Sequence, residues 1–156
     1  MRRRDLLAMA AALAVIAACE DSHDAFIVHG YDPARDPRAD LAMAVDRAQA
    51  ENKNILLIVG GEWCIWCHML QRYLDSNADV RDAFAASFVI LKVNYSDDNK
   101  NAAFLGAYPR STGYPDFFVL DPGGAFLAQQ STGDLEQGRG YNRARMMDFA
   151  RRWRRA

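Results

Sequence analysis

Two cysteines separated by two residues stand where the sequence predicts redox chemistry. Cys64 and Cys67 follow the apolar run Ile55–Val59 and two glycines. A helix that begins here places positions i and i+3 on one face, so the two sulfurs can close a disulfide with little backbone movement. The unpaired N–H groups and the dipole of a helix N-terminus stabilise a thiolate on the first cysteine. The spacing therefore predicts a dithiol/disulfide switch with Cys64 as its nucleophile.

The composition is that of one ordinary globular domain with a leader. Of 156 residues, 51% are apolar and 25% are charged. The formal charge of −1 argues against a nucleic-acid partner, because no strongly basic field surrounds the chain. The chain has three cysteines, two of them in the CxxC, so an apolar core rather than a disulfide framework must hold the fold together.

Residues 1–18 have the parts of a secretory signal peptide. Three arginines precede an apolar run from Leu6 to Ala18, which is too short to span a bilayer and ends in small residues. The end of this run resembles a bacterial lipobox, in which Cys19 becomes the lipid-modified N-terminus after cleavage. The alternative is ordinary cleavage near Ala17 or Ala18, which leaves Cys19 as a free thiol. Both interpretations predict export to an oxidising compartment, the bacterial periplasm, and the first adds a lipid anchor in the membrane.

The rest of the chain divides into a polar tether, residues 19–37, and a folded domain, residues 38–156. The tether contains two Asp-Pro pairs and shows no hydrophobic periodicity. Asp40 is the expected cap of the first helix, whose apolar residues recur at helical spacing. The later elements are expected to be strands over 55–59 and 88–94, a helix over 64–74, short helices over 80–86 and 100–108, a hairpin over 117–128 and a helix over 141–153. This order predicts a single α/β domain with a central mixed β-sheet flanked by helices.

Three segments of this chain resemble the thioredoxin superfamily, and more narrowly the exported thioredoxin-like proteins with a Trp-Cys-x-Trp-Cys-His active site. They are Trp63–His68 after a strand, Lys92–Asn94 at the end of the next strand, and Gly113–Pro115 just before the hairpin. The resemblance covers about residues 38–156 and implies a thioredoxin-like fold. It also implies that Tyr114–Pro115 is a cis peptide bond, in a loop that lies against the CxxC and pairs with the substrate backbone.

The resemblance implies a thiol–disulfide oxidoreductase whose only redox group is the Cys64–Cys67 disulfide, with no separate cofactor and no metal. Cys64 attacks a disulfide in a partner protein, and Cys67 resolves the mixed disulfide. The expected substrate-binding residues are Trp63, Trp66, Tyr114 and Pro115. No flavin or nicotinamide fingerprint is present, so the expected electron donor is a membrane or periplasmic redox protein. The residues leave open whether the protein reduces, oxidises or isomerises its substrates.

The chain departs from thioredoxin where that protein has a buried aspartate that helps to move protons at the second cysteine. Ile58 stands at this position, and Lys92 matches the lysine that pairs with the aspartate in the family. Lys92 is thus expected to lack that partner. Glu62, His68 and Lys92 are candidate modulators of the cysteines, and a protonated His68 would stabilise a thiolate. For Glu62 an ordinary solvated side chain is the more common role, and for His68 a partly exposed polar residue in the first helical turn is the alternative.

A c-type haem is one alternative interpretation of the motif. Residues 64–68 match the CxxCH attachment pattern, with His68 as the proximal ligand and a methionine such as Met146 as the distal one. The buried strand before the motif and the strands after it argue against this, because c-type haem domains are mostly helical.

Two further alternatives use the same residues. Cys64, Cys67 and His68 offer soft metal ligands, but no second Cys/His cluster supplies the fourth ligand of a closed site; His23 and His29 lie in the polar lead-in. The other alternative is a non-catalytic thioredoxin-like binding module that keeps the CxxC as a structural disulfide. A reduction potential below about −300 mV would indicate such a structural bridge.

Overall fold

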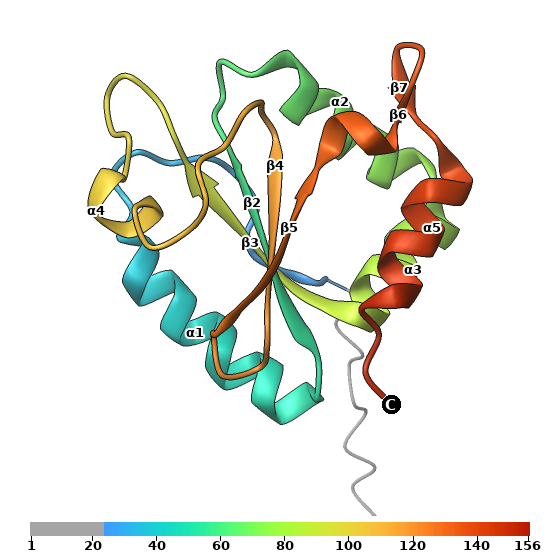
Figure 1. Ribbon diagram of the computed structural model, residues 1–156, viewed down its shortest axis with the longest axis horizontal. Helices are drawn as coiled ribbons and strands as arrows, with labels where there is room; N and C mark the ends of the chain where they lie inside the picture. Colours follow the sequence, from blue (N-terminus) through green and yellow to red (C-terminus); the bar gives the residue numbers. More distant parts are fainter. Residues whose placement is uncertain (1–23) are drawn as a thin grey trace, which may run out of the picture.

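A five-stranded mixed β-sheet separates two layers of helices (Figure 1). The computed structural model describes residues 24–156. The strands lie in the order β1-β3-β2-β4-β5; β1, β3 and β2 run parallel, and β4 and β5 run antiparallel to their neighbours. Their bounds are Phe26–Val28 for β1, Asn54–Gly60 for β2, Phe88–Asn94 for β3, Asp116–Leu120 for β4 and Phe126–Ser131 for β5.

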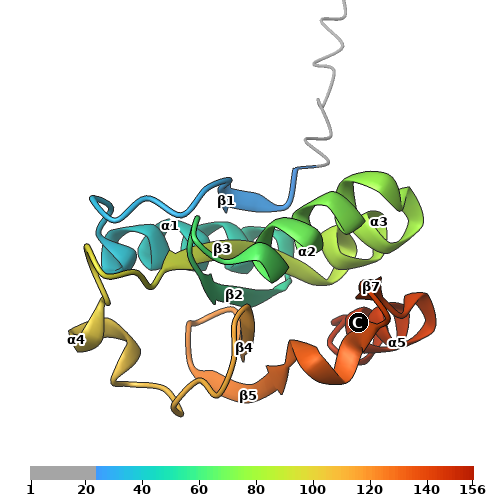
Figure 2. The same cartoon turned by 90° about the horizontal axis from the view of Figure 1, so that it is seen from above.

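The helices divide between the two faces of the sheet (Figures 1 and 2). One face is covered by α1 (Pro37–Glu51) and α4 (Ala102–Leu105), and the other by α2 (Ile65–Ser76), α3 (Ala78–Ser87) and α5 (Arg143–Arg152). Between β5 and α5 the chain forms a 3-10 turn, η1 (Thr132–Leu135), and a short hairpin of β6 (Glu136–Gln137) and β7 (Gly140–Tyr141).

The alternation of side chains along the strands builds one core on each face. Leu56 and Ile58 of β2 pack against α2, α3 and α5, while Ile55, Leu57 and Val59 pack against α1. Every residue of β2 is buried, which explains the continuous apolar run in the sequence. The larger core contains a cluster of phenylalanine rings whose centroids lie 5.5–6.3 Å apart, formed by Phe84, Phe88, Phe117 and Phe149.

The predicted fold class is confirmed. Both buried strands, the helix that begins after Cys64 and the hairpin form where the sequence indicates, and β2 pairs in parallel with β3. The hydrophobic pattern decides the strands β2, β3 and β4, whose residues are almost all buried.

The expectation of an irregular tether over residues 19–37 is wrong for its described part. Phe26–Val28 forms the edge strand β1, which pairs in parallel with β3 through residues such as Phe26 and Ile90. A three-residue, half-buried edge strand carries no period that a sequence pattern can reveal. The signal peptide expected over residues 1–18, and Cys19, lie outside the described residues. Within 24–156, no helix has the length and apolar character needed to cross a membrane.

Two expected helix boundaries are corrected as well. Asp36, not Asp40, caps α1: its carboxylate accepts the Arg38 N–H at 2.9 Å, and Pro37 occupies the first turn. Asp40 is buried and forms an ion pair with Arg35. The helix expected over 100–108 is a single turn, because Asn101 takes a left-handed conformation (φ 46°) directly before it and the helix ends at Gly106.

Candidate active site

The site forms where the central strand β2 ends and α2 begins. Gly60 and Gly61 join these elements through close backbone packing: a Cβ on Gly60 would overlap the Sγ of Cys67, and a Cβ on Gly61 would overlap the Trp63 indole. In the sequence the two glycines stand between the buried strand and the CxxC. Their second role is to leave room for Cys67 and Trp63 against the strand.

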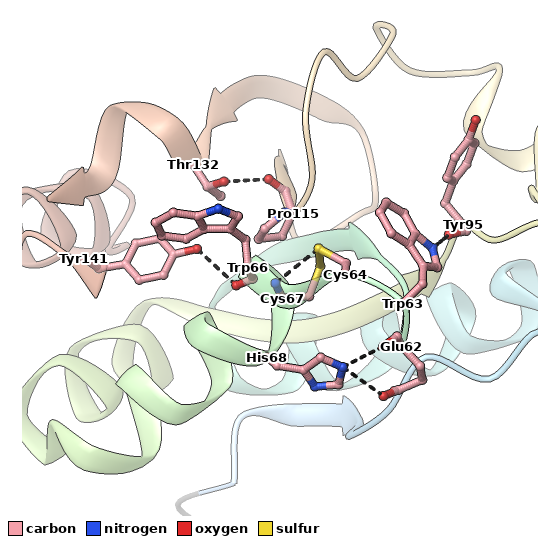
Figure 3. Close-up of a disulfide and its surroundings, with 10 residues drawn as sticks. All are labelled: Glu62, Trp63, Cys64, Trp66, Cys67, His68, Tyr95, Pro115, Thr132 and Tyr141. Atoms are coloured by element: carbon pink, nitrogen blue, oxygen red, sulfur yellow. Dashed lines mark hydrogen bonds and ion pairs between the residues drawn. A yellow bond between two sulfur atoms is a disulfide. The ribbon is translucent and has the colours of Figure 1, made fainter. Parts of the chain in front are cut away.

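Cys64 and Cys67 are joined by a disulfide across the first turn of α2, with Cα atoms 5.2 Å apart (Figure 3). Cys64 is the N-cap of α2: its Sγ accepts the backbone N–H of Cys67 at 3.2 Å, and its carbonyl accepts the N–H of His68 at 3.3 Å. Cys64 is 4% exposed and Cys67 is 3% exposed. The helix terminus therefore supplies an N–H donor to the first sulfur, as the spacing predicts.

The loop before β4 lies next to this junction. The Tyr114–Pro115 peptide bond is cis, which confirms that prediction. Asp116 pairs with Val59 in the antiparallel register of β4 and β2, so Pro115 lies at the strand end that leads to the CxxC. The hydroxyl of Thr132 donates a hydrogen bond to the Pro115 carbonyl at 2.6 Å, which fixes the loop from the η1 side.

Aromatic side chains surround the bridge, with Trp63 on one side and Trp66 on the other in Figure 3. Trp63 is 57% exposed, donates from Nε1 to the Tyr95 carbonyl at 2.7 Å and meets the Tyr114 ring edge-on at 5.6 Å. Tyr114 also stacks on Tyr95 at 4.8 Å. Burial, together with a hydrogen bond to Tyr95, raises the pKa of Tyr114 to about 12.

The other tryptophan has a different environment. Trp66 is half-buried and packs edge-on against Tyr141 at 6.0 Å, and the Tyr141 hydroxyl donates to the Trp66 carbonyl at 3.4 Å. Ile65 between the cysteines is 68% exposed. Trp63 and Ile65 are therefore the strongly exposed apolar side chains beside the bridge.

Two of the three candidate modulators, Glu62 and His68, lie against each other. His68 Nε2 lies 2.7 Å from the Glu62 backbone carbonyl and 3.7 Å from its carboxylate. The other carboxylate oxygen of Glu62 accepts the backbone N–H of Tyr31 at 2.9 Å. Glu62 thus ties the segment after β1 to the active-site turn, and the His68 ring is directed to Glu62 (Figure 3).

Lys92 has neutral partners in place of a carboxylate. Its Nζ donates to the His29 carbonyl at 2.6 Å and to Gln71 Oε1 at 2.7 Å, and it lies 5.3 Å from the centroid of the Tyr31 ring. Burial lowers the pKa of Lys92, since desolvation disfavours its charged form. Ile58 is buried in the core, as its apolar side chain requires.

Two residues of the site were not found from the sequence. Tyr31 lies in the segment taken as a tether, and Thr132 follows the hairpin in a turn with no pattern of its own. Tyr31 is 6% exposed and Thr132 is 3% exposed. An aromatic residue among polar neighbours is the sequence signal that could have found Tyr31, whereas a single threonine carries none.

The side chains around the bridge bear on the metal and haem interpretations of the motif. Among residues 24–156, no group of three or more His, Cys, Asp or Glu side chains is placed to hold a metal ion. In the CxxCH segment the two sulfurs are bonded to each other and the His68 ring lies on Glu62, while Met146 is buried in the core on the α5 side. The chemistry that this arrangement supports is thiol–disulfide exchange.

The sequence matches the family model described as "Thioredoxin-like" over residues 36–122. The chain belongs to this family. The matched segment contains α1, β2, the CxxC, β3 and the cis-proline loop, so it includes every motif on which the resemblance to the thioredoxin superfamily rests.

The chain matches short parts of much longer relatives. The chain is 33% identical over 83 residues to human spermatogenesis-associated protein 20, which covers 51% of this chain and 11% of that protein. It is 29% identical over 119 residues to the thiol:disulfide interchange protein DsbD of a Pseudomonas species, which covers 75% of this chain and 19% of DsbD. The chain therefore spans only a small part of the length of these relatives.

Solved structures show the same fold. A disulphide isomerase from Xylella fastidiosa Temecula1 superposes with a TM-score of 0.66 at 24% identity, covering 78% of this chain and 94% of that one. The oxidised C-terminal domain of DsbD from Neisseria meningitidis superposes with a TM-score of 0.58 at 18% identity, covering 76% and 97%. At these identities the likeness establishes the fold.

Proposed function

We propose that this protein is an exported thiol–disulfide oxidoreductase that reduces or exchanges disulfides in partner proteins. The Cys64 thiolate attacks a substrate disulfide, forms a mixed disulfide and releases one substrate thiolate. Cys67 then attacks the Sγ of Cys64, closes the 64–67 bridge and releases the second substrate thiolate. Two electrons pass from the dithiol to the substrate, and a dithiol redox protein must return them.

The position of Cys64 carries this proposal. Its sulfur is the N-cap of α2 and accepts the Cys67 N–H, so a negative charge on this sulfur is stabilised by the helix terminus. Cys67 lies in the first turn, its sulfur packed against Gly60. The likeness to proteins named as disulfide isomerase and as DsbD supports the same chemistry.

The substrate is proposed to bind at the surface around the bridge. Trp63 and Ile65 offer exposed apolar area, and the Tyr114–Pro115 loop brings backbone groups to the same edge of the sheet. Tyr114 and Trp63 hold each other through edge-on ring packing. Trp66 contributes from the other side, where it is braced by Tyr141. In this proposal Glu62, His68 and Lys92 fix the shape of the site.

The location and the donor belong to the proposal as well. The basic and apolar leader of residues 1–18, followed by Cys19, supports export to the bacterial periplasm with a lipid anchor at Cys19. A periplasmic or membrane redox protein would then supply the electrons. Metabolic labelling with a tagged fatty acid tests the anchor: the label should disappear in Cys19→Ser, and a label that survives this change would refute it.

Trapping of partner proteins tests the proposed chemistry. In a Cys19→Ser background, Cys67→Ser should accumulate reducible mixed disulfides on a non-reducing gel, because the attacking sulfur remains and the resolving one is gone. Cys64→Ser should accumulate none and should abolish reduction of insulin. Equal trapping by both variants, or trapping by Cys64→Ser alone, would overturn the assignment of Cys64 as nucleophile.

A further inference from the structure

Tyr31 places a phenol hydroxyl in the core directly behind the CxxC. Its side chain packs in the same buried cluster as Cys64, Cys67 and Ile58. A Cβ built on Gly60 would overlap the Sγ of Cys67 and would lie 3.1 Å from the Tyr31 hydroxyl oxygen. The sulfur and the hydroxyl therefore lie against the same small residue, with no side chain of Gly60 between them.

Several contacts hold the tyrosine in this place. Its backbone N–H donates to Glu62 Oε1 at 2.9 Å, and Lys92 Nζ lies 5.3 Å from its ring centroid. Within residues 24–156, we find no protein group that accepts a hydrogen bond from its hydroxyl. The Cys67 sulfur is the reacting atom that lies against the same glycine as this hydroxyl.

The electrostatic surroundings keep the phenol neutral. Burial raises the pKa of Tyr31 above its ordinary value, and the charge of Glu62 and the neighbouring Tyr141 raise it further. Lys92 on β3 is the cation that faces its ring. A neutral phenol cannot act as a base toward Cys67 at physiological pH, but it can donate a hydrogen bond.

We propose that Tyr31 donates a hydrogen bond to the Cys67 thiolate and so assists the resolving step. This inference rests on the proposed function, because it concerns the second half of that reaction. When the mixed disulfide forms on Cys64, Cys67 must lose a proton before it can attack. The proton passes to water or to the departing substrate thiolate, while Tyr31 keeps its own. Tyr31 thus stabilises the thiolate in a site where Ile58 offers no polar group.

The direct test is the pKa of the Cys67 thiol. In a Cys19→Ser, Cys64→Ser background Cys67 is the single thiol of the chain, and its titration is followed by thiolate absorbance. Tyr31→Phe should raise this pKa by about one unit, the expected effect of losing one hydrogen bond to the charged form. Tyr73→Phe is the matched control, because its hydroxyl lies near Asp79 and Arg143 rather than the sulfurs. An unchanged pKa, or an equal shift in both variants, would overturn the inference.

A second measurement does not depend on the stability of the variant. In the same single-thiol protein with tyrosine labelled at the ring carbon that carries the hydroxyl, the NMR signal of Tyr31 should move as Cys67 titrates. A signal that stays constant through the thiol titration would contradict a hydrogen bond. With both active-site cysteines present, Tyr31→Phe should also lengthen the lifetime of mixed disulfides several-fold.

The outcomes separate this inference from the proposed function. If Cys67→Ser traps partner proteins and Tyr31→Phe leaves the pKa of the Cys67 thiol unchanged, the proposed oxidoreductase activity is supported and the role of Tyr31 is refuted. If Cys67→Ser traps no partner, the proposed oxidoreductase activity is refuted, whatever the effect of Tyr31→Phe on the pKa of the Cys67 thiol.

Discussion

The backbone N–H of Cys67 donates a hydrogen bond to the Sγ of Cys64 at 3.2 Å. Cys64 caps α2, so its sulfur is the one best placed to carry a negative charge. The N–H group that donates to this sulfur belongs to Cys67, the other cysteine of the pair. This contact makes the two cysteines chemically unequal, since Cys64 receives the helix N–H and Cys67 packs against the strand.

Ile65→Ser should weaken substrate binding without harming the fold. Ile65 is 68% exposed and lies between the two cysteines, so a bound partner protein would cover it. We expect KM for a protein disulfide to rise about three- to tenfold, the effect of roughly 1 kcal/mol of apolar burial. Met43→Ser, at a side chain that is 54% exposed on α1, is the control and should leave KM unchanged. An equal effect of both variants would contradict a binding role for Ile65.

Thr132→Val should loosen the loop that precedes β4. The buried Thr132 hydroxyl donates to the Pro115 carbonyl at 2.6 Å, and valine leaves that carbonyl without its donor. We expect the free energy of unfolding, measured in urea, to fall by about 1–3 kcal/mol. Thr112→Val, at an exposed threonine of the same loop, should change it by less than about 0.5 kcal/mol. If Thr132→Val is as stable as the control, the hydrogen bond does not hold the loop.

Gly60→Ala should disturb the contact between β2 and Cys67. The added methyl group would overlap the Cys67 sulfur, so the helix turn or the strand must shift. We expect a loss of about 1–3 kcal/mol in the free energy of unfolding. Gly113→Ala is the matched control, since a Cβ there meets no atom within 4 Å. Wild-type stability of Gly60→Ala would show that the site is less tightly packed than described.

The sequence predicted the parts of this site that depend on long, strongly patterned segments. The run Ile55–Val59 is buried on both faces of the sheet, and such burial restricts the strand to apolar residues. This continuous apolar run predicted the strand and the position of the CxxC after it. The cis Tyr114–Pro115 bond followed from resemblance to a family, since one Gly-Tyr-Pro segment has no local physical signal that demands it.

Other parts depend on contacts between residues far apart in the chain. Tyr31 reaches the sulfurs because β1 adds to the edge of β3 and Glu62 anchors the segment that follows. Asp40 looked like a cap because it precedes the apolar positions of α1, yet Asp36 and Pro37 begin the helix and Asp40 pairs with Arg35. Lys92 donates to the backbone carbonyl of His29 and to the side chain of Gln71, which lie on two other segments, so these contacts follow from the tertiary fold alone.

Asp116 gives the domain a pH-dependent contribution to stability. Burial raises the pKa of Asp116 above its ordinary value of 3.8, even though Gln129 donates to its carboxylate at 2.7 Å. Because the folded-state pKa exceeds the unfolded-state value, this stability is present below the unfolded-state pKa and is lost as pH rises through the folded-state pKa. The unfolding free energy of the wild type minus that of Asp116→Asn should therefore fall as pH increases from about 4. Urea unfolding at several pH values measures this difference, and a rise with pH would contradict the assigned shift.

The reduction potential of the Cys64–Cys67 couple tests the central claim most directly. The protein, with Cys19 replaced by serine, is equilibrated in redox buffers of known potential and the fraction of the bridged form is determined. An exchange-active pair should have a potential above about −300 mV, within the range of thioredoxin-like oxidoreductases. A potential below about −300 mV would make the bridge a structural disulfide and the domain a binding module, and would contradict the account given for Cys64.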